Sequence, residues 1–121
     1  MDERGLLSPA TEAEARERYR ELGPAAQTEV VETARDALFA SLLSVTLGTR
    51  AEYESFRDAH PSLEAFENGS ENVSHAAWHV VEFADAVVVT TYENEPDAAA
   101  ATLRRVAHGR FYSELVRPTD E

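Results

Sequence analysis

Residues 86–92, Ala-Val-Val-Val-Thr-Thr-Tyr, carry the strongest strand pattern in this 121-residue chain. Consecutive β-branched side chains followed by a tyrosine suit a pleated sheet, where such residues pack well against their neighbours. A second apolar stretch, residues 73–83, precedes this run and is separated from it by Ala84-Asp85. The pattern therefore predicts two adjacent strands, and the rest of the fold has to be built around them.

Two Thr-x-x-Glu patterns, which begin at Thr11 and Thr49, predict the N-termini of two helices. In such a pair the two side chains cap free N–H groups of the first turn. We expect the first helix to end at Gly23-Pro24, because glycine commonly ends helices. The other helix should end at His60-Pro61, because a residue that precedes proline avoids the helical region.

Two further helices are expected from apolar periodicity, one with its stripe over residues 30–38 and one over residues 94–109. Residues 41–48 are ambiguous, since they can prolong a helix, but their alternation and β-branched residues favour a strand. Asn68-Gly69 predicts a turn, with a hairpin as one form of it.

The predicted order of elements is α, α, β, α, β, β, α. It describes an α+β fold with a short antiparallel sheet packed against about four helices. An all-α fold is the alternative, because residues 73–92 are also rich in alanine. The length suits a single domain over residues 1–121, in which we expect residues 1–10 and 117–121 to be mobile.

The chain contains no lysine: its 11 basic residues are all arginine, set against 23 acidic residues, for a formal net charge of −12. Such self-repulsion strains a compact state unless salt screens it, and the Debye length falls to roughly 3 Å at about 1 M salt. We therefore expect a cytoplasmic protein of a salt-accumulating cell. A GC-rich genome, which favours arginine over lysine, is the alternative explanation.

Several classes of site are excluded by composition. The chain has no cysteine, which rules out disulfides, thiolate metal sites and a cysteine nucleophile. The first residues lack the apolar core of a secretory signal, and the longest mostly apolar run, residues 37–47, is too short to span a bilayer. Neither a serine-nucleophile motif nor a phosphate loop occurs, so we predict no catalytic residue and no bound cofactor.

His75, His79 and Glu82 are the candidate metal ligands. At positions i, i+4 and i+7 of a helix they would share one face, with the imidazoles roughly 6 Å apart, and such a set suits Zn²⁺ or Fe²⁺. On a strand the two histidines would lie about 13 Å apart, and Glu82 would point to the other side. The secondary structure of residues 73–83 therefore decides between a metal site and two ordinary histidines on a sheet face.

Arg104, Arg105, His108 and Arg110 form a locally basic stretch in this acidic chain. It suits contact with an anion or a partner, because each guanidinium can donate paired hydrogen bonds. Helix electrostatics is the alternative, since cations in the last turns of a helix complement its dipole and pair with nearby acids. A net charge of −12 and the weakening of phosphate contacts by salt argue against nucleic acid.

Residues 111–116, Phe-Tyr-Ser-Glu-Leu-Val, are unusually apolar for a segment that follows the last predicted helix. An apolar stretch of this kind packs either on its own domain or on a second molecule. We therefore expect a homo-oligomer or a complex with another protein, and no contact with a membrane.

Loose patterns spread over most of the chain carry a resemblance to a known family. They are Tyr19–Gln27, Thr33–Ser41, Val45–Arg50, Thr102–Arg105 and Gly109-Arg110. These stretches resemble an uncharacterised family of short acidic haloarchaeal proteins, a domain of unknown function. The resemblance implies a haloarchaeal source and a cytosolic setting, and it supplies no catalytic residues.

Three hypotheses of function follow. The leading one is a non-enzymatic cytosolic interaction or regulatory module that is adapted to high salt and self-associates. The second is a metal-binding protein or small metalloenzyme that uses the two histidines and Glu82. The third is an accessory DNA-associated regulator that uses the arginines of residues 104–110.

Overall fold

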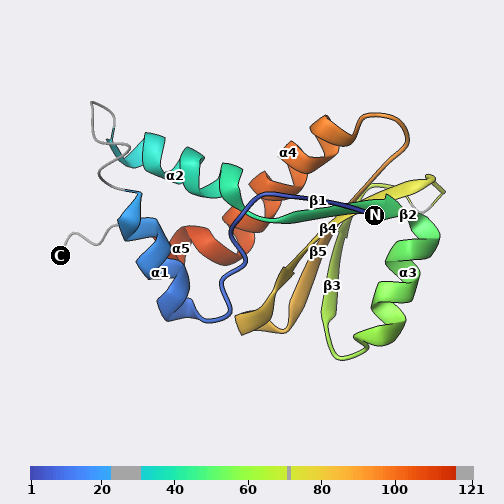
Figure 1. The fold of residues 1–121 in the computed structure, drawn as a ribbon, viewed down its shortest axis with the longest axis horizontal. Helices are drawn as coiled ribbons and strands as arrows, with labels where there is room; N and C mark the ends of the chain where they lie inside the picture. Colours follow the sequence, from blue (N-terminus) through green and yellow to red (C-terminus); the bar gives the residue numbers. More distant parts are fainter. Residues whose placement is uncertain (23–30, 71, 117–121) are drawn as a thin grey trace.

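The computed structural model describes residues 1–22, 31–70 and 72–116, which form an α+β fold (Figure 1). Its elements in chain order are β1 (Asp2–Arg4), α1 (Glu12–Glu21), α2 (Val31–Leu42), β2 (Val45–Thr49), α3 (Arg50–Ala59), β3 (Glu64–Asn68), β4 (His75–Val81), a 3₁₀ turn (Glu82–Ala84), β5 (Ala86–Tyr92), α4 (Pro96–Ala107), a π-helical turn (His108–Tyr112) and α5 (Ser113–Val116). The predicted fold class, α+β, is confirmed.

The described strands form one mixed sheet in the order β1-β2-β4-β5-β3. Neighbouring strands run antiparallel, except that β3 and β5 are parallel. β4 and β5 pair from His75 opposite Tyr92 to Val81 opposite Ala86. This pairing confirms the two adjacent strands that the β-branched run predicts. Asp85 closes the connection between them in the left-handed region, with φ of +51°.

Helices cover the two faces of the sheet unequally (Figure 1). On one face α1, α2 and α4 enclose the larger core, in which Val88, Leu103 and Tyr112 are fully buried. On the other face, helix α3 packs Tyr53 against a smaller core around Trp78. Both cores draw on β4 and β5, because successive side chains of a strand point to opposite faces.

Both predicted helix starts carry the threonine cap, but only the pair at Thr49 forms the reciprocal box; at the first helix the Glu14 carboxylate accepts from the N–H of Ala10 instead. The hydroxyl of Thr11 accepts the N–H of Glu14 at 3.0 Å. Thr49 and Glu52 form a complete capping box, with bonds of 2.9 and 3.1 Å. Helix α3 then ends directly before His60-Pro61, as predicted.

Three predictions of secondary structure are corrected. Residues 41–42 finish helix α2, so the strand expected over residues 41–48 begins only at Val45. The hairpin form of the turn predicted at Asn68-Gly69 does not occur, because β3, which ends at Asn68, and the following strand β4 are not neighbours in the sheet. Gly109 does not end the last helix, since helical turns continue through the π turn into α5.

The first residues of the chain, which the sequence leads us to expect as mobile, supply an edge strand. Asp2–Arg4 pairs with Val45–Leu47 of β2. Gly5 then turns the chain with φ of +91°, where an added Cβ would lie only 2.5 Å from the carbonyl oxygen of Leu43. The backbone at Gly5 therefore requires glycine both for its dihedral angle and for its close approach to Leu43.

Two predictions, the helix end at Gly23-Pro24 and the mobile residues 117–121, fall outside the described residues. Within the described part of the chain, no helix combines the length and the apolar content needed to cross a membrane.

Candidate functional site

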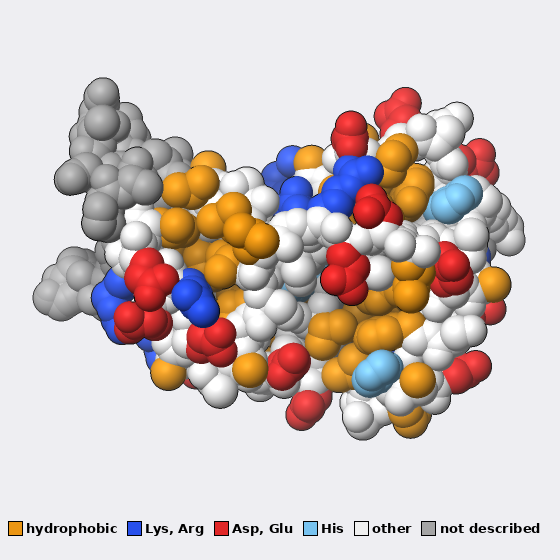
Figure 2. Space-filling model, viewed as in Figure 1, with side chains coloured by type: hydrophobic (Ala, Val, Ile, Leu, Met, Phe, Trp, Pro, Cys, Tyr) orange, Lys and Arg blue, Asp and Glu red, His pale blue; other side chains and the backbone are white. Residues whose placement is uncertain are grey.

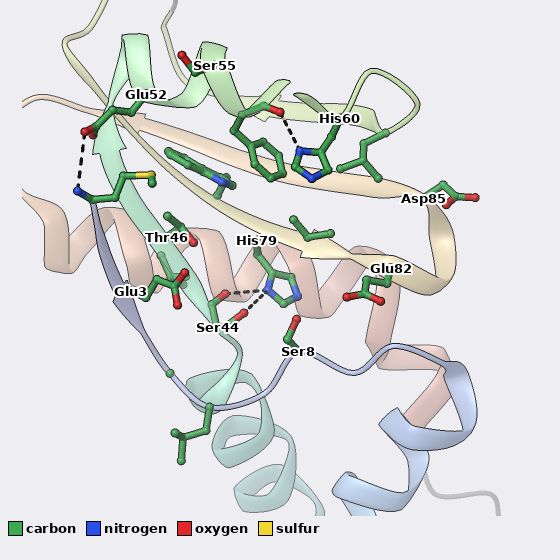
Figure 3. A pocket seen from close by; sticks show the side chains of 18 residues that line it. Glu3, Ser8, Ser44, Thr46, Glu52, Ser55, His60, His79, Glu82 and Asp85 are labelled. Atoms are coloured by element: carbon green, nitrogen blue, oxygen red, sulfur yellow. Dashed lines mark hydrogen bonds and ion pairs between the residues drawn. The ribbon is translucent and has the colours of Figure 1, made fainter. Parts of the chain in front are cut away.

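A groove of about 970 Å³ lies between helix α3 and the N-terminal segment, which we define as residues 1–8 (Figure 3). Strands β2 and β4 supply the sheet surface between these two walls. We call this cavity the α3 groove. Its position follows from the unequal covering of the sheet, because α3 is the only described helix that packs on this face.

The floor of the α3 groove is apolar. Trp78 and Val80 point from β4 toward α3, since even-numbered residues of this strand face that helix. Phe56 and Leu63 complete the floor, and the Phe56 ring centroid lies 5.7 Å from that of Trp78. Figure 2 shows apolar side chains gathered between the N-terminal segment and the end of α3, with acidic side chains around them.

The rim of the α3 groove is acidic. Glu3 and Glu52 lie toward one end and Glu82 and Asp85 toward the other (Figure 3). Three of these carboxylates are exposed, and Glu52 is half-buried. The backbone N–H of Thr49 holds the pKa of Glu52 below its usual value, because it donates a hydrogen bond to the carboxylate. The rim therefore carries negative charge at neutral pH.

His60 stands at the end of α3 beside this floor. Its ring stacks on Phe56 with 4.4 Å between centroids and an interplanar angle of 26°. Nδ1 lies 3.0 Å from the carbonyl oxygen of Phe56, so this nitrogen donates to the carbonyl. The contact holds the imidazole against the floor as one more flat ring.

His79 lines the deep side of the groove, but its side chain turns into the larger core and is only 2 % exposed. Nδ1 lies 2.7 Å from the carbonyl oxygen of Ser44, and Nε2 lies 2.8 Å from the hydroxyl of Tyr112. Because a carbonyl only accepts, Nδ1 carries the proton and Nε2 accepts from Tyr112. Burial lowers the pKa of His79 to about 4 and raises that of Tyr112.

The three candidate metal ligands are not brought together. Residues 75–81 form strand β4, and the ring of His75 stacks on Tyr92 with 5.2 Å between centroids. His79 has both ring nitrogens engaged in the core, while Glu82 begins the following 3₁₀ turn. Among the described residues, no group of three or more histidine, cysteine, aspartate or glutamate side chains is placed to hold a metal ion.

The basic stretch on the last helix also spreads over different neighbours. The side chain of Arg104 extends to the segment between α2 and β2, where its Nε donates a hydrogen bond to the carbonyl oxygen of Leu43 at 2.8 Å. Burial lowers the pKa of Arg104, and the nearby charge of Arg4 acts in the same direction. The ring of His108 lies 5.9 Å from that of Phe39.

Arg105 and Arg110 are exposed. Arg105 donates a long hydrogen bond to the hydroxyl of Thr102 on its own helix, at 3.5 Å. The guanidinium of Arg110 lies 4.5 Å from the centre of the Phe66 ring. The basic stretch is therefore two anchored residues, Arg104 and His108, and two exposed arginines.

Local sequence patterns point to few of the groove residues. Glu52 is expected as a helix cap, and the structure gives it this role. Nothing in the sequence connects Glu3 with Glu82 and Asp85, because they come from segments far apart in the chain. One signal was available in the sequence of β4. Because successive side chains of a strand point to opposite faces, Trp78 and Val80 must face one side of the sheet and His79 the other.

A family model described as a family of unknown function (DUF5809) matches residues 27–113, which is more than half of the chain. This match confirms the part of the sequence resemblance that places the chain in an uncharacterised family. No curated protein and no solved structure matches the chain.

Proposed function

We propose that this chain, which belongs to the DUF5809 family of unknown function, is a non-enzymatic binding module. Its α3 groove takes a cationic, partly apolar segment of a partner protein. The observation that carries the proposal is an apolar floor enclosed by carboxylates at both ends of one groove.

The floor favours a protein segment as the occupant. Aromatic side chains are enriched at the buried centres of protein interfaces, and here Trp78, Phe56 and His60 lie side by side. Burial of apolar surface contributes roughly 25 cal/mol per Å². A partner side chain laid on these rings would therefore gain free energy from burial alone.

The rim selects the charge of that segment. Carboxylates at both ends of the groove repel an acidic partner and attract a basic one. Aromatic faces also attract cations within about 6 Å of the ring centre. An arginine side chain matches both features, because its stem is apolar and its head is a flat cation.

The deep side of the groove supports binding rather than catalysis. His79 is neutral at neutral pH, since its pKa is lowered to about 4. Both of its ring nitrogens are already bonded, at 2.7 and 2.8 Å. It is therefore poorly suited to take a proton from a ligand in the groove.

The proposal includes the cytoplasm of a salt-accumulating, haloarchaeal cell as the setting. The support is the net charge of −12 and the absence of lysine. Screening in molar salt removes the long-range repulsion. We expect the melting temperature to rise as KCl increases into the molar range, and a flat melting temperature would contradict this setting.

The chain's only tryptophan lies in the groove floor, so its fluorescence reports directly on the occupant. We expect a short peptide of alternating arginine and leucine to shift Trp78 emission and to saturate. A peptide with glutamate in place of arginine is the control. Binding that is equal for both peptides, or absent for both, would contradict the proposal.

A matched pair of variants tests where the peptide binds. Glu3→Gln with Glu82→Gln removes charge from the rim and should weaken binding about tenfold, as the loss of two exposed ion pairs of about 0.7 kcal/mol each would. Glu93→Gln with Glu95→Gln removes the same charge outside the groove and should leave binding nearly unchanged. Equal weakening by both pairs would mean that net charge, and not the groove, determines affinity.

A further inference from the structure

We infer that the partner segment is the end of helix α4 and the π turn of a second copy of this chain, which places Arg105 and Arg110 in the α3 groove. The inference rests on the proposed function, because it names the occupant of the same groove. Its basis is a set of arginines and carboxylates that form no ion pair within the described part of one molecule.

Five of the described arginines already have a carboxylate within 4.0 Å. The ion-paired ones are Arg4, Arg16, Arg18, Arg20 and Arg50. Within the described residues, no such pair forms at Arg105 or Arg110, although both side chains are exposed in a chain rich in acids. Pairing with the acidic surface therefore does not account for these two arginines.

Helix electrostatics does not account for Arg105 either. A cation is favoured in the last turn of a helix, where carbonyl groups are free. Helix α4 ends at Ala107, but helical turns continue through the π turn to Val116. Arg105 consequently lies near the middle of one continuous helical segment.

Arg110 is held in a form that suits an intermolecular contact. Its guanidinium lies over the Phe66 ring, 4.5 Å from the ring centre. Stacking uses the flat face of the guanidinium and leaves the N–H groups along its edge able to donate. A carboxylate of a second molecule can accept from that edge while the stacking is kept.

The complementary carboxylates lie on the rim of the α3 groove. Glu3, Glu82 and Asp85 are exposed, and none of them forms an ion pair within the described ranges. Helices α3 and α4 lie on opposite faces of the sheet (Figure 1). The carboxylates of the α3 groove and the two arginines that follow from α4 are therefore kept apart in one molecule. A second copy brings them together.

Contact between two different surfaces of the same chain is head-to-tail. Each bound copy leaves one groove and one arginine pair open, so the assembly grows into a ring or an open filament. An association of two identical acidic grooves is disfavoured, because Glu3, Glu82 and Asp85 would face like charges. Self-association is therefore assigned to the α3 groove of one copy and to Arg105 and Arg110 of the next copy.

A mixture of two variants, each with one of the two surfaces altered, tests this arrangement. The groove variant is Glu3→Gln with Glu82→Gln, and the arginine variant is Arg105→Gln with Arg110→Gln. Molar mass is measured by light scattering over a concentration series in about 1 M KCl, where screening reduces the net repulsion. Far-ultraviolet circular dichroism checks that every variant is folded.

We expect the wild-type mass to rise with concentration beyond twice the 13.4 kDa of one chain. Each variant alone should stay near 13.4 kDa, because one of its two surfaces is broken. An equimolar mixture of the two variants should form a dimer that does not grow further. Arg16→Gln with Arg20→Gln, the same charge change on α1, should associate like the wild type.

Three outcomes overturn the inference: a wild-type protein that stays monomeric, variants that assemble like the wild type, or a mixture that gives no dimer. These outcomes are distinguishable from failure of the proposed function. A monomeric protein whose Trp78 emission still responds to the arginine peptide keeps the groove as a binding site and rejects only the second copy as its occupant.

Discussion

The two faces of the sheet use their polar groups in opposite ways. On the face covered by α1, α2 and α4, His79 and Tyr112 hydrogen-bond to each other at 2.8 Å inside the core. On the face covered by α3, Glu3 and Glu82 remain exposed beside apolar rings. We call the first face the closed face, because its polar groups bond to each other within the core. We call the second the open face, because it leaves apolar surface and charge exposed to a partner.

This difference separates stability from binding. A buried polar group that is left unpaired costs about 1–3 kcal/mol, and His79 and Tyr112 avoid this cost by bonding to each other. Exposed carboxylates carry no such cost, because water solvates them. The closed face should therefore determine whether the chain folds, and the open face what it binds.

Truncation of one leucine on each face should give the largest difference in unfolding free energy between the two faces. Leu103, on helix α4, is 0 % exposed, whereas Leu63, on the groove floor, is only partly buried. We expect Leu103→Ala to cost about 4 kcal/mol of unfolding free energy and Leu63→Ala about 1 kcal/mol. Denaturant unfolding at fixed KCl measures both, and equal losses would mean that the two faces contribute alike to stability.

The closed face was the more predictable of the two from sequence. The β-branched run over residues 86–92, whose Val88 packs into this face, and the cap that Thr11 gives helix α1 are local patterns, and the structure keeps both. Their physical causes act within a few residues of sequence. Patterns of that kind are visible without any knowledge of the tertiary fold.

Apart from helix α3, the open face was not predictable, because its other parts meet only through tertiary structure. Strand β3 has little alternation and a mixture of exposed and half-buried side chains, so its parallel pairing with β5 leaves no local signal. Strand β1 is three residues long and polar. The π turn, which belongs to the closed face, is also invisible in the sequence, since Gly109 lies in open space and the turn brings Tyr112 to His79.

A pH titration of stability sharpens the comparison on the closed side. Burial lowers the pKa of His79 from its ordinary 6.5 to about 4. Between pH 4 and pH 6.5, His79 is therefore protonated in the unfolded chain and neutral in the folded chain. The free energy of unfolding should therefore fall by about 3 kcal/mol as pH decreases from 6.5 to 4, with the full stability present above 6.5.

The acidic surface titrates over part of the same range, so the quantity to measure is the difference between the wild type and His79→Gln. The wild-type curve should lose more stability than the variant curve as pH falls toward 4. Parallel curves would show that His79 does not contribute to the acid sensitivity of the closed face.

Removal of one hydroxyl from each core gives the smallest and most closely matched effect. In Tyr112→Phe, Nε2 of His79 loses its donor at a position that water does not reach, and we expect a loss of about 2 kcal/mol. In Tyr53→Phe, the lost partner is Glu67, which is exposed and lies 3.3 Å from the hydroxyl. Water can replace that bond, so the expected loss is below about 0.5 kcal/mol. Thermal unfolding of both variants measures the difference, and a larger loss in Tyr53→Phe would reverse the assignment of the closed and open faces.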